Sequence, residues 1–303
     1  MNSYNDGIKL VGRNLRGGKW MDMYQRVFKR FEKKYLLDEG QYRDLIGLIY
    51  DKLEYDKYEK YTVCNIYFDT PGFDIIRESL EKPMYKEKLR IRSYGVCDAD
   101  GEVFVEMKKK FKGVVYKRRA AMSWRDGVRF LIEGQEPGEG LSAEAGQVLN
   151  EVKWFMHRRA VYPMLYLAYD RVVMRGKDDG NLRITFDTNI RWRAEEIDLT
   201  LGDYGHLSLG PGQYLMEIKT CGGMPIWLAE ALSGLGIFPR SYSKYGTIYR
   251  EHLMGMDGLP KRQPGCDVDA ISGLPKRQPG CDVDAINQSE KESKEKKEEK
   301  DCA

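Results

Sequence analysis

The sequence lacks the short motifs that mark several large enzyme classes. Its 303 residues contain no CxxC pair, no zinc-like cysteine spacing, no GxxxxGK loop, no HExxH and no GxSxG. These absences exclude zinc-ribbon sites, P-loop nucleotide hydrolases, HExxH metallopeptidases and serine hydrolases built on a nucleophile turn. The three histidines, His157, His206 and His252, are isolated along the chain, so we expect structural or surface roles for them.

Long apolar runs are also missing. No stretch of about 18 apolar residues could span a membrane, and residues 1–20 are basic but lack the apolar core of a secretory signal. The six cysteines follow no pairing pattern, and Cys64 and Cys97 lack the basic neighbours that would mark a catalytic thiol. We therefore expect reduced thiols in a cytoplasmic protein.

The composition divides the chain into three parts. Residues 1–25 are predicted to be a flexible extension, and residues 26–253 carry the periodic patterns of one folded domain. In residues 254–303 a Gly- and Pro-rich segment, Gly258–Ile271, recurs identically 15 residues later, and a Lys/Glu/Ser run follows. Because such a composition cannot bury a core, we predict a disordered low-complexity tail, with partner binding as the alternative role.

The strongest pattern is a set of three charged strands between Lys88 and Arg119. Charged side chains alternate with apolar ones in each strand, and most of the charges are positive. The alternating polar positions are Lys88, Arg90, Arg92 and Tyr94, then Glu106, Lys108 and Lys110, then Lys117 and Arg119. Successive strand residues point to opposite faces, so each strand has one apolar and one cationic face.

The same alternation appears in other segments of the chain. Further strands are predicted at residues 26–35, 61–69, 165–173, 182–188 and 214–220. Asp38 and Gln41 have capping-box spacing and predict a helix with an apolar face that reaches Leu53. Other helices are predicted from about Ala143 and from Pro225.

These elements predict an α+β fold in which an antiparallel β-barrel is flanked by helices. Any single strand of this kind could simply have a solvated face. Here the polar positions carry more Arg and Lys than Glu, and the helices can cover the apolar faces from outside. The cationic faces would then line a tunnel, where a chain of phosphates would neutralise them better than a bulky duplex. Glu32, Glu106 and Glu217 could hold a divalent cation, although salt bridges to lysines are the simpler explanation.

Eight motifs, in this order along the chain, carry a resemblance to a known family. They are RFEKKY (Arg30–Tyr35), YKEKLRIRSYG (Tyr85–Gly95), VFVEMKKK (Val103–Lys110), VVYKRR (Val114–Arg119), AYDR (Ala168–Arg171), LRITFDTNIR (Leu182–Arg191), LMEIK (Leu215–Lys219) and SKYG (Ser243–Gly246). Together they resemble the VTC domain, the polyphosphate polymerase domain of the CYTH-like, triphosphate-tunnel superfamily. Neither an SPX domain nor membrane helices accompany it, so the resemblance is to the stand-alone bacterial form.

The resemblance implies transfer of the γ-phosphate of ATP onto a growing polyphosphate chain, with Mn²⁺ or Mg²⁺ as the cofactor. It implies catalytic roles for Arg90, Arg92, Lys108, Lys117, Arg171, Arg183 and Lys244. Phosphate contacts are expected from Lys34, Arg119, Tyr169, Lys219 and Ser243. The metal ligand would be Glu217, with Glu32 and Glu106 as further candidates. The first motif has Arg30 two residues before Glu32, where triphosphatases of the superfamily carry a second glutamate.

Two alternatives remain open at this point. The same tunnel could use water as the acceptor, which would make the protein a tripolyphosphatase or nucleoside triphosphatase. It could also bind polyphosphate without turnover. We expect ATP and polyphosphate as partners, no nucleic acid and no membrane span, and a monomeric protein.

Overall fold

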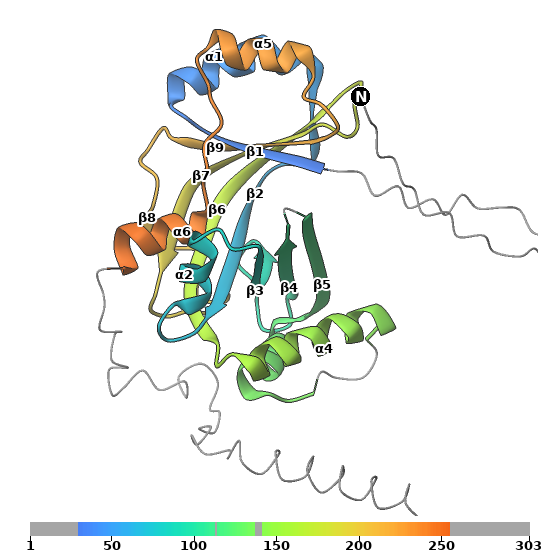
Figure 1. The fold of residues 1–303 in the computed structure, drawn as a ribbon, viewed down its shortest axis with the longest axis vertical. Coiled ribbons are helices and arrows are strands. Elements are labelled where there is room, and N and C mark those ends of the chain that lie inside the picture. Colours follow the sequence, from blue (N-terminus) through green and yellow to red (C-terminus); the bar gives the residue numbers. More distant parts are fainter. Residues whose placement is uncertain (1–29, 113, 137–140, 255–303) are drawn as a thin grey trace, which may run out of the picture.

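The computed structural model describes residues 30–254 except Gly113 and residues 137–140 (Figure 1). The predicted extension at residues 1–25, the first four residues of the predicted first strand, and the tail beyond Met254 lie outside the described residues. Among the helices of the described part, none is long and apolar enough to cross a membrane.

A single antiparallel sheet forms the centre of the molecule (Figure 1). Its strand order is β1-β9-β7-β6-β2-β3-β4-β5, with the short β8 paired to β7. The strands are β1 (Arg30–Leu37), β2 (Leu53–Asp69), β3 (Tyr85–Tyr94), β4 (Glu102–Phe111), β5 (Val114–Ser123), β6 (Tyr162–Gly176), β7 (Arg183–Arg193), β8 (His206–Leu207) and β9 (Tyr214–Cys221). The predicted antiparallel sheet with flanking helices is confirmed.

Helices cover both ends of this sheet. They are α1 (Glu39–Ile49), α2 (Asp74–Leu80), α3 (Trp124–Val128), α4 (Ala143–Arg158), α5 (Ile226–Gly234) and α6 (Lys244–Ile248). The other helical segments are a 3-10 helix, η1 (Tyr50–Lys52), and two π-helices, η2 (Arg129–Glu133) and η3 (Tyr249–Leu253). Figure 1 places α1 and α5 together over the β1–β9 end, and α4 crosswise beside one end of β3, β4 and β5.

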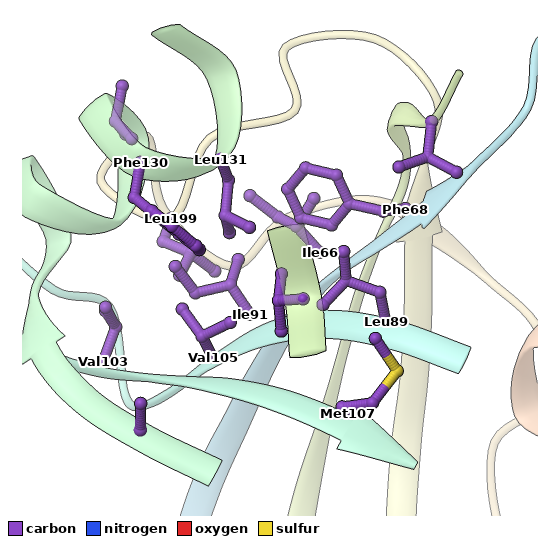
Figure 2. Close-up of a cluster of buried hydrophobic side chains, with 14 of the residues drawn as sticks. Ile66, Phe68, Leu89, Ile91, Val103, Val105, Met107, Phe130, Leu131 and Leu199 are labelled. Atoms are coloured by element: carbon purple, nitrogen blue, oxygen red, sulfur yellow. The ribbon is translucent and has the colours of Figure 1, made fainter. Parts of the chain in front are cut away.

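The outer face of the sheet carries two apolar cores, one for each half. Beneath α3, η2 and α4, the first core contains outward residues of β2, β3 and β4, such as Ile66, Ile91 and Val105 (Figure 2). Beneath α1 and α5, the second contains Phe186 and Ile218 from β7 and β9. Burying these faces is the main favourable term in forming the fold, so the charged faces are forced to the opposite side.

A third apolar core occupies one end of the inner face. It joins Leu165, Leu167 and Leu215 of the sheet to Tyr245 and Ile248 of α6. The inner face is therefore polar along only part of its length. Because α6 packs here, its first residue is held close to the charged strands.

Local predictions were confirmed where short-range chemistry determines the structure. Asp38 caps α1: its Oδ1 accepts a hydrogen bond from Gln41 N at 2.8 Å, and the Gln41 side chain accepts one from Asp38 N. The predicted start of α4 at Ala143 is also correct. Leu53 was wrongly placed in the first helix, because it begins β2. Its spacing from Ile49 matches a helix, but α1 ends there and Leu53 packs in the outer core with it.

The sheet is curled rather than closed by hydrogen bonds. Among the described residues, β1 and β5 are the two edge strands and do not pair with each other. The curl nevertheless brings β4 near β1. Lys108 of β4 lies close enough to Glu32 and Lys34 of β1 for their charges to act on its pKa. Closure of a barrel depends on strand register across the whole sheet, which alternation within single strands does not determine.

Candidate functional site

The candidate site is the inner face of the curled sheet. The residues of β1, β3, β4, β5, β6, β7 and β9 that alternate with the apolar outward ones point here. Its cations are Lys34, Lys88, Arg90, Arg92, Lys108, Lys117, Arg119, Arg171, Arg183 and Lys219, and Lys244 of α6 joins them. The carboxylates among them are Glu32, Glu106, Asp187 and Glu217. The structure thus places the cationic positions that were predicted from strand alternation on one face of the sheet.

Glu217 is the centre of the first charge cluster. Its Oε1 lies 2.9 Å from Lys34 Nζ and 3.6 Å from Lys244 Nζ, and its Oε2 lies 3.4 Å from Lys219 Nζ. Burial alone would raise the pKa of Glu217, but Lys244, Lys34 and Lys219 outweigh it and hold that pKa well below its usual range. The carboxylate is therefore ionised even though it is buried.

Asp187 fixes a second group of cations beside the first. It is fully buried and accepts two hydrogen bonds from Arg171 and one from Lys244. Both cations also lie over the ring of Tyr169, Arg171 at 4.9 Å and Lys244 at 4.4 Å from its centroid. Asp187 was not predicted as a site residue. Its only sequence signal was its place on the same strand face as Arg183.

Glu106 is the centre of a cluster on β3, β4 and β5. Arg90 Nη2 lies 2.7 Å from Glu106 Oε2, and Lys117 Nζ lies 2.6 Å from Oε1. Arg92 Nε is 3.8 Å from Oε2. Burial would raise the pKa of Glu106, but these three cations lower it to about 2. Glu106 thus positions the cations that were predicted to bind phosphate.

Two neutral residues of β2 complete this cluster. Asn65 Oδ1 accepts a hydrogen bond from Arg92 Nε at 2.9 Å, and Tyr67 Oη accepts one from Arg90 Nη1 at 3.0 Å. Burial would raise the pKa of Tyr67, but Arg90 and Arg92 lower it overall. Neither residue was predicted as part of the site. They share one face of β2, so alternation in residues 61–69 could have indicated them.

Three lysines lie side by side across adjacent strands. Lys88 pairs with Lys108 in the β3–β4 register, and Lys108 pairs with Lys117 in the β4–β5 register. Burial lowers the pKa of Lys88 to about 8, and Lys86 and Lys108 add to this effect. Burial likewise lowers the pKa of Lys117 to about 8 despite the opposing effect of Glu106. Adjacent ammonium groups of this kind favour an anionic ligand.

The remaining predicted residues differ in their surroundings. Arg183 Nε is buried and has no hydrogen-bond partner among the described residues. Arg119 is exposed on β5, with its guanidinium carbon 4.7 Å from the ring centroid of Phe104. Ser243 caps α6 by accepting a hydrogen bond from Gly246 N at 3.2 Å. The Ser243 side chain therefore orients the helix that presents Lys244.

Among the described residues, two histidines contact an aromatic ring and one cysteine packs against the outer core. His206 and His252 lie against the ring of Trp192, at centroid distances of 5.3 and 5.1 Å. Burial raises the pKa of Cys97 to about 11, which keeps this thiol protonated and weakly nucleophilic.

The inner-face carboxylates could hold a metal ion only if phosphate oxygens supplied some of its other ligands. Within the described residues, no three His, Cys, Asp or Glu side chains gather closely enough to hold a metal. Glu32 and Glu217, however, both contact the ammonium of Lys34. Magnesium commonly takes one or two carboxylates and completes its shell with phosphate oxygens and water. Glu32 and Glu217 are therefore the pair that fits such an ion.

The chain belongs to the VTC domain family, because the family model described as the VTC domain matches residues 29–251. This range includes the inner-face clusters described above. The family resemblance seen in the eight sequence motifs is thereby confirmed. The search of curated proteins finds no match to this chain.

Three solved structures are similar over most of their length. A proposed adenylate cyclase from Vibrio parahaemolyticus has 11% identity and a TM-score of 0.39, covering 73% of this chain and 97% of its own. A protein from Pyrococcus horikoshii has 15% identity and a TM-score of 0.36, covering 73% and 98%. A proposed adenylyl cyclase from Hippeastrum, for which a dominant triphosphatase activity is described, has 16% identity and a TM-score of 0.43, covering 72% and 94%. The family assignment rests on the family model alone.

Proposed function

We propose that this protein is an ATP-dependent polyphosphate polymerase that works with a divalent metal ion. The observation that carries the proposal is the excess of cations over carboxylates on the inner face. Lys88 and Lys108 have no carboxylate partner within 4.0 Å among the described residues, and Arg183 Nε is buried without a partner. Buried or crowded cations of this kind are costly unless an anion neutralises them. A linear phosphate chain supplies closely spaced charge of the required sign.

In the proposed reaction, a terminal phosphate oxygen of the polyphosphate acceptor attacks the γ-phosphorus of ATP. The bond between that phosphorus and the β–γ bridging oxygen breaks, and its electron pair stays on ADP. The products are ADP and a chain longer by one phosphate. Since the acceptor supplies the nucleophile, no protein nucleophile is needed.

The chain's own residues act by positioning and by charge. Arg171 and Lys244 are held by Asp187, and Arg90, Arg92 and Lys117 are held by Glu106. Because these cations are fixed before substrate arrives, they need little reorganisation to stabilise charge on the moving phosphoryl group. Glu217 and Glu32 would hold the metal ion, which would supply positive charge to neutralise part of the phosphate charge.

Polymerisation is favoured over hydrolysis by one sequence feature. Residue 30 is an arginine, two positions before Glu32 on the same strand, where a second carboxylate would help to hold metal or water. An arginine at this position of the sequence supplies no such carboxylate. Water as the acceptor remains the second candidate, and the test below distinguishes the two.

The test is to incubate the purified protein with ATP and Mn²⁺ and to resolve the products by size. Long-chain polyphosphate, with one ADP released for each phosphate unit incorporated, is the expected result. Free phosphate without chains would identify a triphosphatase and overturn the proposal. Tight polyphosphate binding without any ATP turnover would identify a binding module and would overturn it as well.

A further inference from the structure

Three aromatic side chains form a row across the inner face. The rings of Tyr61 on β2 and Tyr94 on β3 meet edge to face at a centroid distance of 5.7 Å. Tyr94 and Phe104 on β4 repeat this geometry at the same distance. Arg119 of β5 ends the row, 4.7 Å from the Phe104 centroid. We call Tyr61, Tyr94 and Phe104 the aromatic shelf.

The shelf is on the charged side of the sheet rather than in a core. Tyr94 is the next inner-face residue after Arg92 on β3, and Phe104 precedes Glu106 on β4. Tyr94 is 50% exposed, although the outward residues of the same strands are buried beneath α3 and α4. Three ordered rings of which one is open to solvent offer a flat apolar surface to a ligand.

The shelf continues directly into the phosphate-binding cations. Tyr61 is opposite Arg171 in the β2–β6 register. Burial raises the pKa of the Tyr61 hydroxyl, and Arg171 and Arg183 oppose that shift, so both guanidinium groups are within electrostatic range. Arg183 is also the residue whose buried Nε has no partner in the described structure. A ligand could therefore place phosphates at Arg171 and Arg183 and a ring on the shelf.

We propose that the aromatic shelf binds the purine ring of ATP while the triphosphate extends among the inner-face cations. This subsite rests on the proposed function, since it assigns a place to the base of the same donor nucleotide. Tyr94 provides the stacking surface, because it is the exposed ring of the three. Arg119 is the neighbouring cation that can lie against the edge or face of the base.

This arrangement separates the donor from the growing chain. A base stacked on Tyr94 stays outside the cationic interior, whereas polyphosphate has no base and needs none of the shelf. The shelf should therefore increase affinity for nucleoside triphosphates and leave affinity for inorganic tripolyphosphate unchanged.

The experiment measures equilibrium binding of ATP and of tripolyphosphate to the full-length protein by calorimetry. Tyr94→Ala is expected to weaken ATP binding roughly tenfold, as the loss of one base–aromatic stack does, with no change for tripolyphosphate. Tyr94→Phe keeps the ring and should bind ATP as the wild type does. The matched control is Phe111→Ala, which removes a ring of similar exposure, 45%, from the outer face of β4.

Two outcomes would overturn the subsite. Equal weakening of both ligands in Tyr94→Ala would mean that the shelf only shapes the cationic site. Unchanged ATP binding would mean that the base does not rest there. Because binding is measured without turnover, a protein that fails to make polyphosphate can still pass this test, and an active polymerase can still fail it.

Discussion

Arg171 and Asp187 form a two-pronged ion pair between adjacent strands, with Nε to Oδ1 at 2.6 Å and Nη2 to Oδ2 at 2.7 Å. Asp187 is completely buried, and Lys244 of α6 contacts the same carboxylate. One carboxylate thus joins β6, β7 and α6. A buried charge pair seldom adds much stability compared with an apolar pair, but removing one member leaves the other uncompensated.

Asp187→Asn is therefore expected to destabilise the fold. The substitution leaves Arg171 without its paired carboxylate and leaves Lys244 with Glu217 alone, and the expected loss is about 3 kcal/mol in the free energy of unfolding. Urea denaturation measures it. The control, Asp100→Asn, breaks the exposed ion pair of Asp100 with Arg125 and should cost less than about 1 kcal/mol. Equal effects of the two substitutions would show that Asp187 is not the buried anchor described above.

Lys244→Ala is expected to abolish polyphosphate synthesis without unfolding the protein. Asp187 would keep Arg171, and Glu217 would keep Lys34 and Lys219, so no carboxylate is left unpaired. The loss of one fixed cation at the transferred phosphate should lower kcat roughly a hundredfold or more. Product formation is followed together with circular dichroism. A folded variant with wild-type kcat would contradict the assigned role.

Lys108 and Lys109 offer a matched comparison on β4. Lys108 is on the inner face, whereas Lys109 points outward to Glu151 of α4, with Nζ 3.2 Å from Oε2. Lys108→Ala should weaken tripolyphosphate binding roughly tenfold or more, while Lys109→Ala should leave it unchanged. Calorimetric dissociation constants measure both. A larger effect of Lys109→Ala would place the phosphate site on the outer face of the sheet and contradict the assignment to the inner face.

The inner face could be predicted because strand alternation is a local property. The neighbours of Arg90 and Arg92 in sequence, Leu89 and Ile91, show which way each side chain points without any knowledge of the partner strands. The helices that bury the outer face could be predicted in the same way, from the capping spacing at Asp38 and from apolar periodicity.

The parts that escaped prediction depend on residues distant in the chain. Asp187 becomes a site residue only because β6 pairs with β7 and α6 brings Lys244 to it. Tyr94 and Phe104 form a shelf only when β3 and β4 are in register. Strand order and curl are set by packing of the whole sheet, and the same limit explains why barrel closure could not be inferred from single strands.

The affinity for phosphate is expected to fall as pH rises through about 8. Burial lowers the pKa of Lys117 to about 8, so Lys117 carries its charge below that pH and loses it above. Phosphate binds the charged form, and Lys117→Arg keeps its charge throughout this range. Tripolyphosphate affinity between pH 7 and 9.5 should therefore decline more steeply in the wild type than in the variant. Parallel curves would show that Lys117 does not titrate in contact with the ligand. The comparison is internally controlled, since ionisation of the ligand affects both proteins equally.

Metal binding should depend on Glu217 more than on Glu106. Glu217 and Glu32 both contact Lys34, so two carboxylates lie close together there. Among the charged residues described, Glu106 contacts only cations, namely Arg90, Arg92 and Lys117. Glu217→Gln is expected to weaken Mn²⁺ binding roughly tenfold or more in the presence of tripolyphosphate, since loss of a ligand costs at least as much as loss of a residue that orients one.

Glu106→Gln should retain Mn²⁺ affinity while weakening phosphate affinity, because it frees the cations that Glu106 positions. Electron paramagnetic resonance of free and bound Mn²⁺ measures the first effect, and calorimetry measures the second. The opposite pattern, with Mn²⁺ lost in Glu106→Gln and kept in Glu217→Gln, would move the metal site to β4 and refute the assignment to Glu217 and Glu32.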